Sequence, residues 1–243
     1  VCIYCSRFVE STDHCFTNHD RIAELNLYDG KTDRYFSGSP VPLAEDLRTW
    51  SLGETEAISS VTYPRERPYY VELSPEKMLP YELETIEIDT CYNKIFTPEM
   101  VAGHWKMASQ SLNSVILSQS MAIKIFGNAE SAIGKHMTLM RRLNTSPEST
   151  PKTGGIVYTI QAVMKDIPLN NSLDFMQNID MLTVNDSEGL LQSSKRHNMT
   201  GANTYVLLSP QTTCTDLEKQ FLKRDYTYTC LLYTSPSPRD ISG

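Results

Sequence analysis

The chain has 243 residues, of which 40% are hydrophobic and 9% aromatic, and its formal net charge is −7. This length allows one large domain or two small ones, and the apolar share is sufficient for an ordinary hydrophobic core. The 29 acidic against 22 basic residues argue against a nucleic-acid partner, because phosphate binding needs a concentrated basic surface. No run approaches the roughly 18–20 apolar residues that cross a bilayer, and the amino end lacks a signal-peptide pattern.

Cysteine and histidine residues gather near the amino end. Cys2 and Cys5 form a C-x-x-C pair, and His14, Cys15 and His19 follow, so a tetrahedral zinc ion is one interpretation. A zinc finger separates its ligand pairs by about twelve residues, whereas eight residues separate Cys5 from His14. We therefore predict no metal site here, and the sequence leaves open whether Cys2, Cys5 and Cys15 pair with one another or bind metal.

The first part of the chain predicts one helix among several strands. Residues 21–27 alternate loosely and indicate a strand that ends at the turn of Asp29 and Gly30. A helix is expected after Pro42, with Leu43, Ala44, Leu47 and Trp50 on one face and Gly53 at its end. Further strands are predicted over residues 57–63, 69–73 and 81–89, separated by proline-containing turns.

The last of these strands carries closely spaced acidic residues. Glu82 and Glu84, and then Glu87 and Asp89, alternate with apolar residues in the segment YELETIEID. Carboxylates at this spacing lie side by side instead of across a cleft, so they do not form an acid–base pair. The pattern predicts a strand with one solvated face.

Residues 114–135 give the clearest local signals in the sequence. Val115, Ile116 and Leu117 predict a short buried strand, and Ser118 is expected to cap a helix that carries Met121, Ala122, Ile125 and Phe126 on one face. Gly127 is expected to end that helix in the left-handed conformation.

A phosphate-binding loop is excluded just after that helix. Gly134 and Lys135 resemble the end of such a loop, but its first glycine is replaced by Ala129 and its Ser or Thr by His136. We therefore predict a turn between a helix and a strand and no nucleotide site.

The remaining segments are mainly strands. Met137 and Leu139 alternate with polar residues, residues 156–164 keep a period of two, residues 173–183 are expected to be partly extended, and residues 204–208 form a further strand. A helix over residues 215–223 is expected to bury Leu217, Phe221 and Leu222. Strands outnumber helices about two to one, which favours an α+β fold over a doubly wound parallel sheet.

No catalytic constellation stands out in the sequence. The chain contains neither a G-x-S-x-G elbow nor an H-E-x-x-H helix, and its five histidines are scattered. We therefore predict that the chain is not an enzyme and has no catalytic, cofactor-binding or metal-binding residues and no cofactor.

Five segments in succession point to a known family. They are DRIAELNL (20–27), SPVPLAEDLRTW (39–50), NSVILSQSMAIKIFGNAESAIGKHMTL (113–139), YTIQAVMKDIPLNNSLDFMQNIDML (158–182) and NTYVLLSP (203–210). Their order and content resemble the MacB-type periplasmic core domain of FtsX-like ABC-transporter permeases, in the versions found in Bacteroidetes-type bacteria. The resemblance implies a two-lobed α+β domain. Residues 1–91 plus 186–229 would form a porter-like α/β lobe, and residues 92–185 an inserted, mainly β second lobe.

The same resemblance implies a function. In the family this domain lies between the first and second membrane helices of the permease, at the bacterial inner membrane, and faces the periplasm. It couples cytoplasmic ATP hydrolysis to periplasmic conformational change for export or signalling, as rigid lobes moved about a hinge. The implied partners are a cytoplasmic ATPase subunit or domain, a second permease copy in a dimer, and a periplasmic or outer-membrane protein. The sequence names no substrate.

Two other functions and the character of both chain ends remain open at this stage. The alternatives are a free-standing periplasmic binding module and an uncharacterised hydrolase. We expect a fragment, since the membrane helices are not in this sequence. Residues 230–243 break the preceding pattern and are expected to be a non-native tail, with a proline-rich linker as the alternative.

Overall fold

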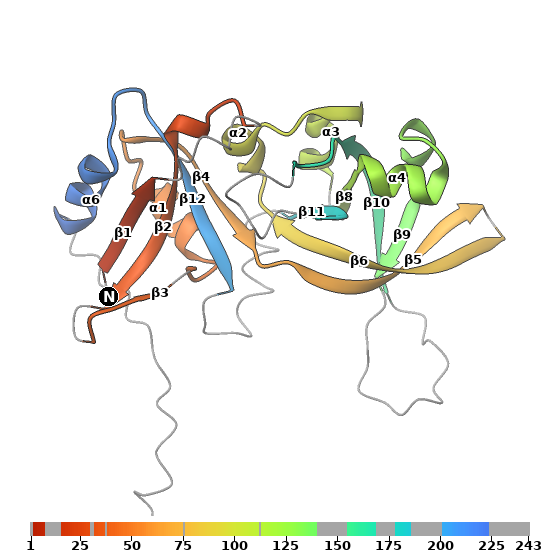
Figure 1. Ribbon diagram of the computed structural model, residues 1–243, viewed down its shortest axis with the longest axis horizontal. Helices are drawn as coiled ribbons and strands as arrows, with labels where there is room; N and C mark the ends of the chain where they lie inside the picture. The colour runs from red at the N-terminus through yellow and green to blue at the C-terminus, as the bar shows by residue number, and fades with distance from the viewer. Residues whose placement is uncertain are drawn as a thin grey trace, which may run out of the picture.

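The structure is a computed structural model of the chain. It describes residues 2–7, 16–29, 32–36, 38–74, 76–111, 113–139, 155–168, 178–185 and 201–223. The molecule is elongated (Figure 1). Strand β1 (Cys2–Arg7) and helix α6 (Cys214–Lys223) lie side by side at one end, and the hairpin of β5 (Arg65–Ser74) and β6 (Lys77–Ile88) forms the other end.

The end that carries β1 is an antiparallel sheet covered by helices, which we call the helix-covered half. Its strands run in the order β1, β2 (Ile22–Asp29), β12 (Ala202–Leu208) and β4 (Thr55–Thr62), and β3 (Arg34–Phe36) pairs with β2. The short 3-10 helix η1 (His19–Arg21) leads into β2.

Helices α1 (Leu43–Thr49) and α6 pack on one face of this sheet because each has an apolar side. Leu43, Ala44 and Leu47 of α1 and Leu217 and Phe221 of α6 join one buried cluster with the sheet. The i, i+3 and i+4 spacing of these residues places them on one side of each helix. The sheet contributes the residues that the two helices cover: Ala23, Leu25, Leu27, Ile58, Val206 and Leu208.

The other end is built from six described strands that close a ring, which we call the ring. Around it run β5, β6, β11 (Met181–Val184), β8 (Ser114–Ser118), β10 (Ile156–Met164) and β9 (His136–Leu139), and β9 pairs back with β5. The β6–β11 and β8–β10 pairs are parallel and the other four are antiparallel. Because each of these strands has a partner on both sides, the ring leaves few free strand edges.

Alternate side chains of the ring strands fill its interior. These side chains form one buried cluster: Tyr69, Val71, Leu83, Val115, Leu117, Met137, Tyr158, Ile160 and Met181. Helix α4 (Gln119–Phe126) adds Met121, Ala122 and Ile125 to the same cluster, and the 3-10 helix η2 (Glu130–Ala132) follows it. A ring of this size is a packed core, not a channel.

The local signals around α4 are confirmed. The Ser118 hydroxyl accepts a hydrogen bond from the Met121 backbone N–H at 3.3 Å, and Gly127 follows the helix with φ of 85°. The strands predicted on either side are present as β8, β9 and β10. The turn at Gly134, with φ of 78°, connects η2 to β9.

Some predicted boundaries are wrong. Helix α1 ends before Gly53, because Ser51 already takes a positive φ of 48°. Leu222 is 70% exposed, since it lies a further 100° around α6 from the buried Phe221. Strands β5 and β6 continue through Pro68 and Pro80, where prolines were expected to lie in the turns.

The short elements that were not predicted include α2 (Tyr92–Phe96), β7 (Met100–Gly103) and α3 (Trp105–Gln110). Elements of four to six residues are too short to show a hydrophobic period, and their stability comes from tertiary packing. Strand β7 pairs with β10, so it extends the sheet beside the ring.

The predicted α+β fold class is confirmed by this arrangement of helices on a mixed sheet. The lobe boundaries stay a prediction. Residues 65–88, assigned to the first lobe, supply β5 and β6, which complete the ring with strands from residues 92–185. The expected tail, residues 230–243, lies outside the described residues.

Candidate functional site: the junction between the two halves

The predicted absence of catalytic and metal-binding residues directs attention to the packing of the two halves. Within the described ranges, no three His, Cys, Asp or Glu side chains come together as metal ligands. Of the residues considered for zinc, Cys2 and Cys5 lie in β1, His19 begins η1, and His14 and Cys15 lie outside the described residues. The described helices are all too short to cross a membrane.

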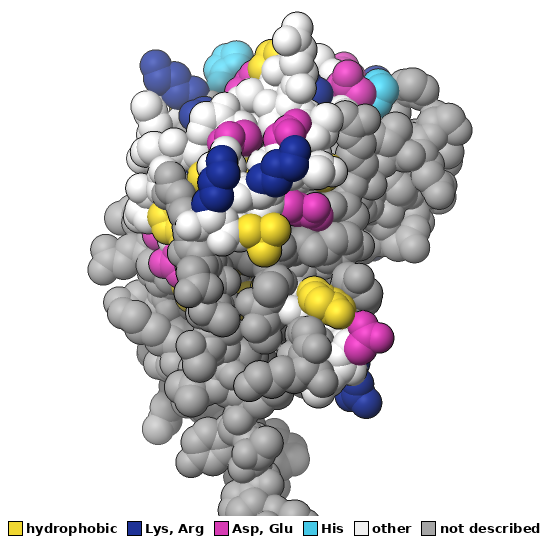
Figure 2. Space-filling view, turned by 90° about the vertical axis from the view of Figure 1, so that its left-hand side faces the viewer, with side chains coloured by type: hydrophobic (Ala, Val, Ile, Leu, Met, Phe, Trp, Pro, Cys, Tyr) yellow, Lys and Arg dark blue, Asp and Glu magenta, His cyan; other side chains and the backbone are white. Residues whose placement is uncertain are grey.

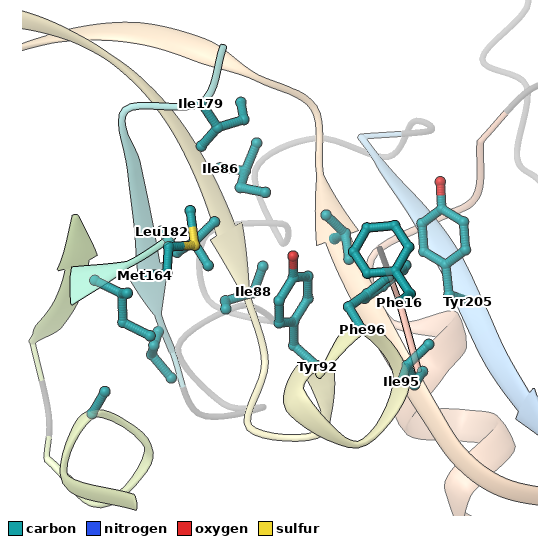
Figure 3. Packing of buried hydrophobic residues seen from close by; sticks show 14 of the residues in the cluster. Phe16, Ile86, Ile88, Tyr92, Ile95, Phe96, Met164, Ile179, Leu182 and Tyr205 are labelled. Atoms are coloured by element: carbon teal, nitrogen blue, oxygen red, sulfur yellow. The ribbon is translucent and has the colours of Figure 1, made fainter. Parts of the chain in front are cut away.

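An apolar cluster connects the two halves (Figure 3), and we call it the junction core. The helix-covered half contributes Phe16, Ile22, Ala57, Val61, Tyr205 and Leu207. The ring strands contribute Ile86, Ile88, Ile116, Ala162, Met164, Leu182 and Val184. Helix α2 lies between them and adds Tyr92, Ile95 and Phe96.

Aromatic rings of α2 are central to the junction core. The Phe96 ring meets Phe16 and Tyr205 of the helix-covered half edge to face, with ring centroids 5.3 and 5.1 Å apart. The Tyr92 ring lies on the other side of Phe96, with ring centroids 4.8 Å apart. Tyr92 also stacks on Trp105 of α3, with ring centroids 6.1 Å apart. Such pairs add about 0.5–1.5 kcal/mol each beyond the area they bury. The five-residue helix α2 therefore packs against elements of both halves.

A buried carboxylate stands beside this core at the end of β6. The Asp89 side chain is 1% exposed. Its Oδ1 accepts hydrogen bonds from the Ser59 hydroxyl at 2.8 Å and the Cys91 N–H at 2.9 Å. Its Oδ2 accepts from Arg48 Nη1 at 2.8 Å and the Ser60 N–H at 3.0 Å. We call Asp89 and these four donors the Asp89 node.

Arg48 extends the node into α1. Its guanidinium also donates to the Ile58 carbonyl and to Glu45 Oε2, both at 2.9 Å. Burial opposes the charge of Arg48, but the attraction of the Asp89 carboxylate and their hydrogen bond outweigh this, so the pKa of Arg48 is raised. The node thus ties α1, β4, the end of β6 and the start of α2 together around one ion pair.

The node corrects the prediction that the acidic residues of this segment are solvated. Glu82 is exposed, as predicted, whereas Asp89 is fully buried. The missed signal was local, since an Asp that bonds the N–H two residues later is typical of an Asx turn at the end of an element. Glu87 also departs from the prediction, because it is mostly buried and paired with Arg67 at 2.6 Å.

Glu87 provides a second tie across the junction. Its backbone N–H donates to the Thr62 hydroxyl of β4 at 2.8 Å, and this bond crosses the junction. Its Oε2 accepts from Asn185 Nδ2 at 3.3 Å, next to β11 within the ring. Inside the ring nearby, burial and the neighbouring Tyr69 raise the pKa of Tyr158 to about 12. These groups hold strands together, and the Tyr158 hydroxyl stays protonated at neutral pH.

The chemistry open to the Asp89 node is structural. Its carboxylate already accepts four hydrogen bonds and pairs with a guanidinium, so it is a poor general base, which needs a free lone pair facing a substrate. A cavity of about 200 Å³ lies beside it, lined by Leu47, Arg48, Cys91 and Lys94 among others. A second, of about 410 Å³, lies at Asp20, Arg21 and residues 209–213. The arginines in both are already bonded, to Asp89 and to Glu56.

Comparison with known structures identifies the fold. The chain is similar to a domain of a protein assigned as a permease from Porphyromonas gingivalis, with a TM-score of 0.64 and 21% sequence identity over 89% of each chain. It is also similar to the periplasmic region of MacB from Actinobacillus actinomycetemcomitans, with a TM-score of 0.54 and 14% identity over 90% of this chain and 87% of that one. No protein-family model and no curated protein matches the sequence.

These observations define a fold, which the chain shares with a permease domain and with the periplasmic region of MacB. The predicted resemblance to the MacB-type periplasmic core domain is confirmed at this level, because the similarity runs along about nine tenths of the chain.

Proposed function

We propose that this chain is the extracytoplasmic domain of an ABC-transporter permease, facing the periplasm from the bacterial inner membrane. Its role is to couple ATP hydrolysis in the cytoplasm to a conformational change outside the membrane, for export or signalling. The domain has no catalysis of its own in this proposal. Its partners are a cytoplasmic ATPase, a second permease copy, and a periplasmic or outer-membrane protein.

The observation that carries the proposal is the position of β1 and α6. They lie side by side at one end of an elongated body, while the ring lies at the other end (Figure 1). In a domain inserted between two membrane helices, the chain must enter and leave the domain close together, on the side that faces the membrane. The fold similarity to a permease domain and to the periplasmic region of MacB supports the same interpretation.

The surface of that end fits a position in water near the membrane. Figure 2 shows charged side chains of both signs interspersed on its described part, with scattered hydrophobic ones. Helix α6 contributes Asp216, Glu218, Lys219 and Lys223, and Lys219 pairs with Asp216 at 3.3 Å. Such a mixed, solvated surface suits a domain that flanking helices hold near the membrane and that is not itself embedded in it.

The two-lobed organisation is part of the proposal. One lobe is the helix-covered half, which would receive the movement of the membrane helices. The other lobe is the ring, which would transmit this movement to a partner protein.

A topology measurement tests the proposal. The complete gene product would be expressed in cells with a clickable amino acid at Glu130, an exposed residue of η2, and treated with a membrane-impermeant dye. We expect labelling from the periplasmic side before the inner membrane is opened, and co-purification of an ATPase. Labelling only after lysis would contradict the proposal. A complete gene without membrane spans would favour the free-standing binding module instead.

A further inference from the structure

We infer that the helix-covered half and the ring move as one rigid lever, fixed at the junction, and not as two lobes hinged between β4 and β5. The mechanical use of this lever rests on the proposed function. The rigidity itself is a property of the chain and can be measured without a transporter.

The backbone alone would permit a hinge. Strands β4 and β6 pair only at Val61 and Ile88, and β4 continues into β5 through Tyr63 and Pro64. A single backbone pair between two strands gives little resistance to bending. Stiffness must therefore come from side chains.

The Asp89 node supplies the first restraint. Asp89 directly follows β6 of the ring, and its donors Ser59 and Ser60 lie on β4 of the helix-covered half. Rotation about residues 62–65 would pull these donors and Arg48 away from a carboxylate with no access to water. Removing the partners of a buried carboxylate is strongly unfavourable. The bond from the Glu87 N–H to Thr62 opposes the same rotation.

The junction core supplies the second restraint. Val61 and Ile88, the one backbone pair between β4 and β6, have no exposed surface, and neither do Tyr92, Phe96 and Tyr205 around them. Two domains move relative to each other by default unless a large apolar interface joins them. Here the interface is continuous with the cores of both halves, so bending would expose apolar surface on either side.

A distance measurement on the full 243-residue chain tests the inference. Nitroxide labels would be attached through p-acetylphenylalanine, which leaves the natural cysteines untouched, at Thr215 of α6 and Glu130 of η2. Both residues are exposed and lie in opposite halves. The control pair is Thr215 with the exposed Thr49 of α1, within the helix-covered half. We expect a single distance distribution across the junction that is no broader than the control, and two peaks or a clearly broader distribution would overturn the inference.

Two matched substitutions then test the node. Asp89→Asn keeps the shape of the side chain but removes the charge that pairs with Arg48, and we expect the Thr215–Glu130 distribution to broaden. Arg21→Met breaks the comparable Arg21–Glu56 pair within the helix-covered half and should leave that distribution unchanged. If Asp89→Asn does not fold, Ser59→Ala removes one donor and should give a smaller broadening. A folded Asp89→Asn chain with an unchanged distribution would rule out the node as a restraint.

Discussion

Replacing Asp89 by alanine should destabilise the fold far more than the loss of one surface acid. The substitution leaves the Ser59 hydroxyl and the Ser60 and Cys91 N–H groups without their acceptor. It also leaves the Arg48 guanidinium, whose side chain is only 23% exposed, without its main counter-charge. Removing one partner of a buried pair costs about 3–5 kcal/mol. For a domain of this size, where 1 kcal/mol shifts the melting temperature by about 2–4 °C, the expected drop is roughly 6–20 °C.

Thermal and urea unfolding of the full chain, followed by circular dichroism, measure this loss. The double variant Arg48→Met/Asp89→Ala should lose at least 1 kcal/mol less than the sum of the two single variants, because the pair is then removed together. An Asp89→Ala loss below about 1 kcal/mol, or strict additivity in the cycle, would refute the assignment of Asp89 as a buried, fully bonded node.

Three further predictions concern the ring and its surroundings. Gly103→Ala should cost about 3 kcal/mol or more of unfolding free energy, measured in urea, because φ is 69° and a Cβ would clash with the Gln161 carbonyl. Gly127→Ala should cost about 1–2 kcal/mol, because φ is 85° but the space around it is open. Equal losses in the two variants would contradict the packing at β7. Burial, then the carboxylates of Glu66 and Asp180, raise the pKa of Glu84 above its ordinary 4.5. The charge of Glu84 therefore destabilises the fold at neutral pH. This loss of stability disappears as the pH falls through the folded pKa toward 4.5. Glu84→Gln should therefore raise the melting temperature at pH 7 by about 1–3 °C and reduce the gain in stability that accompanies a falling pH. A lower melting temperature at pH 7 would exclude the repulsion. Ser118→Ala should cost about 1 kcal/mol of unfolding free energy through loss of the α4 cap, and a change within error would show that the Met121 N–H does not depend on it.

The features that could be predicted from the sequence are those specified by neighbouring residues. Ser118 and Gly127 define the ends of α4 by their own hydrogen bonding and backbone freedom, and the alternation over residues 156–164 gives β10 its full length. The fold class and the resemblance followed from the order of such segments.

The ring and the junction depend on contacts between distant residues. The return of β9 to β5 through Tyr69 and Leu139 joins segments about seventy residues apart, and no local pattern specifies it. The Asx turn at Asp89 is a local feature, but its ion-pair partner Arg48 lies 41 residues earlier, so the burial of Asp89 against Arg48 could not be predicted from spacing. Short helix α2 exists because Tyr92, Ile95 and Phe96 are buried on all sides by both halves.

Spin-label distances in the complete gene product, together with the ATPase that the proposed function assigns to it, test the central claim most directly. A label at Glu130 alone reports the separation of the rings of two copies, and the Thr215–Glu130 pair reports the shape of one copy. We predict that ATP binding changes the distance between copies and leaves the Thr215–Glu130 distance unchanged. An inter-copy distance that does not respond to ATP would contradict the proposed coupling, and a Thr215–Glu130 distance that does respond would contradict the rigid lever.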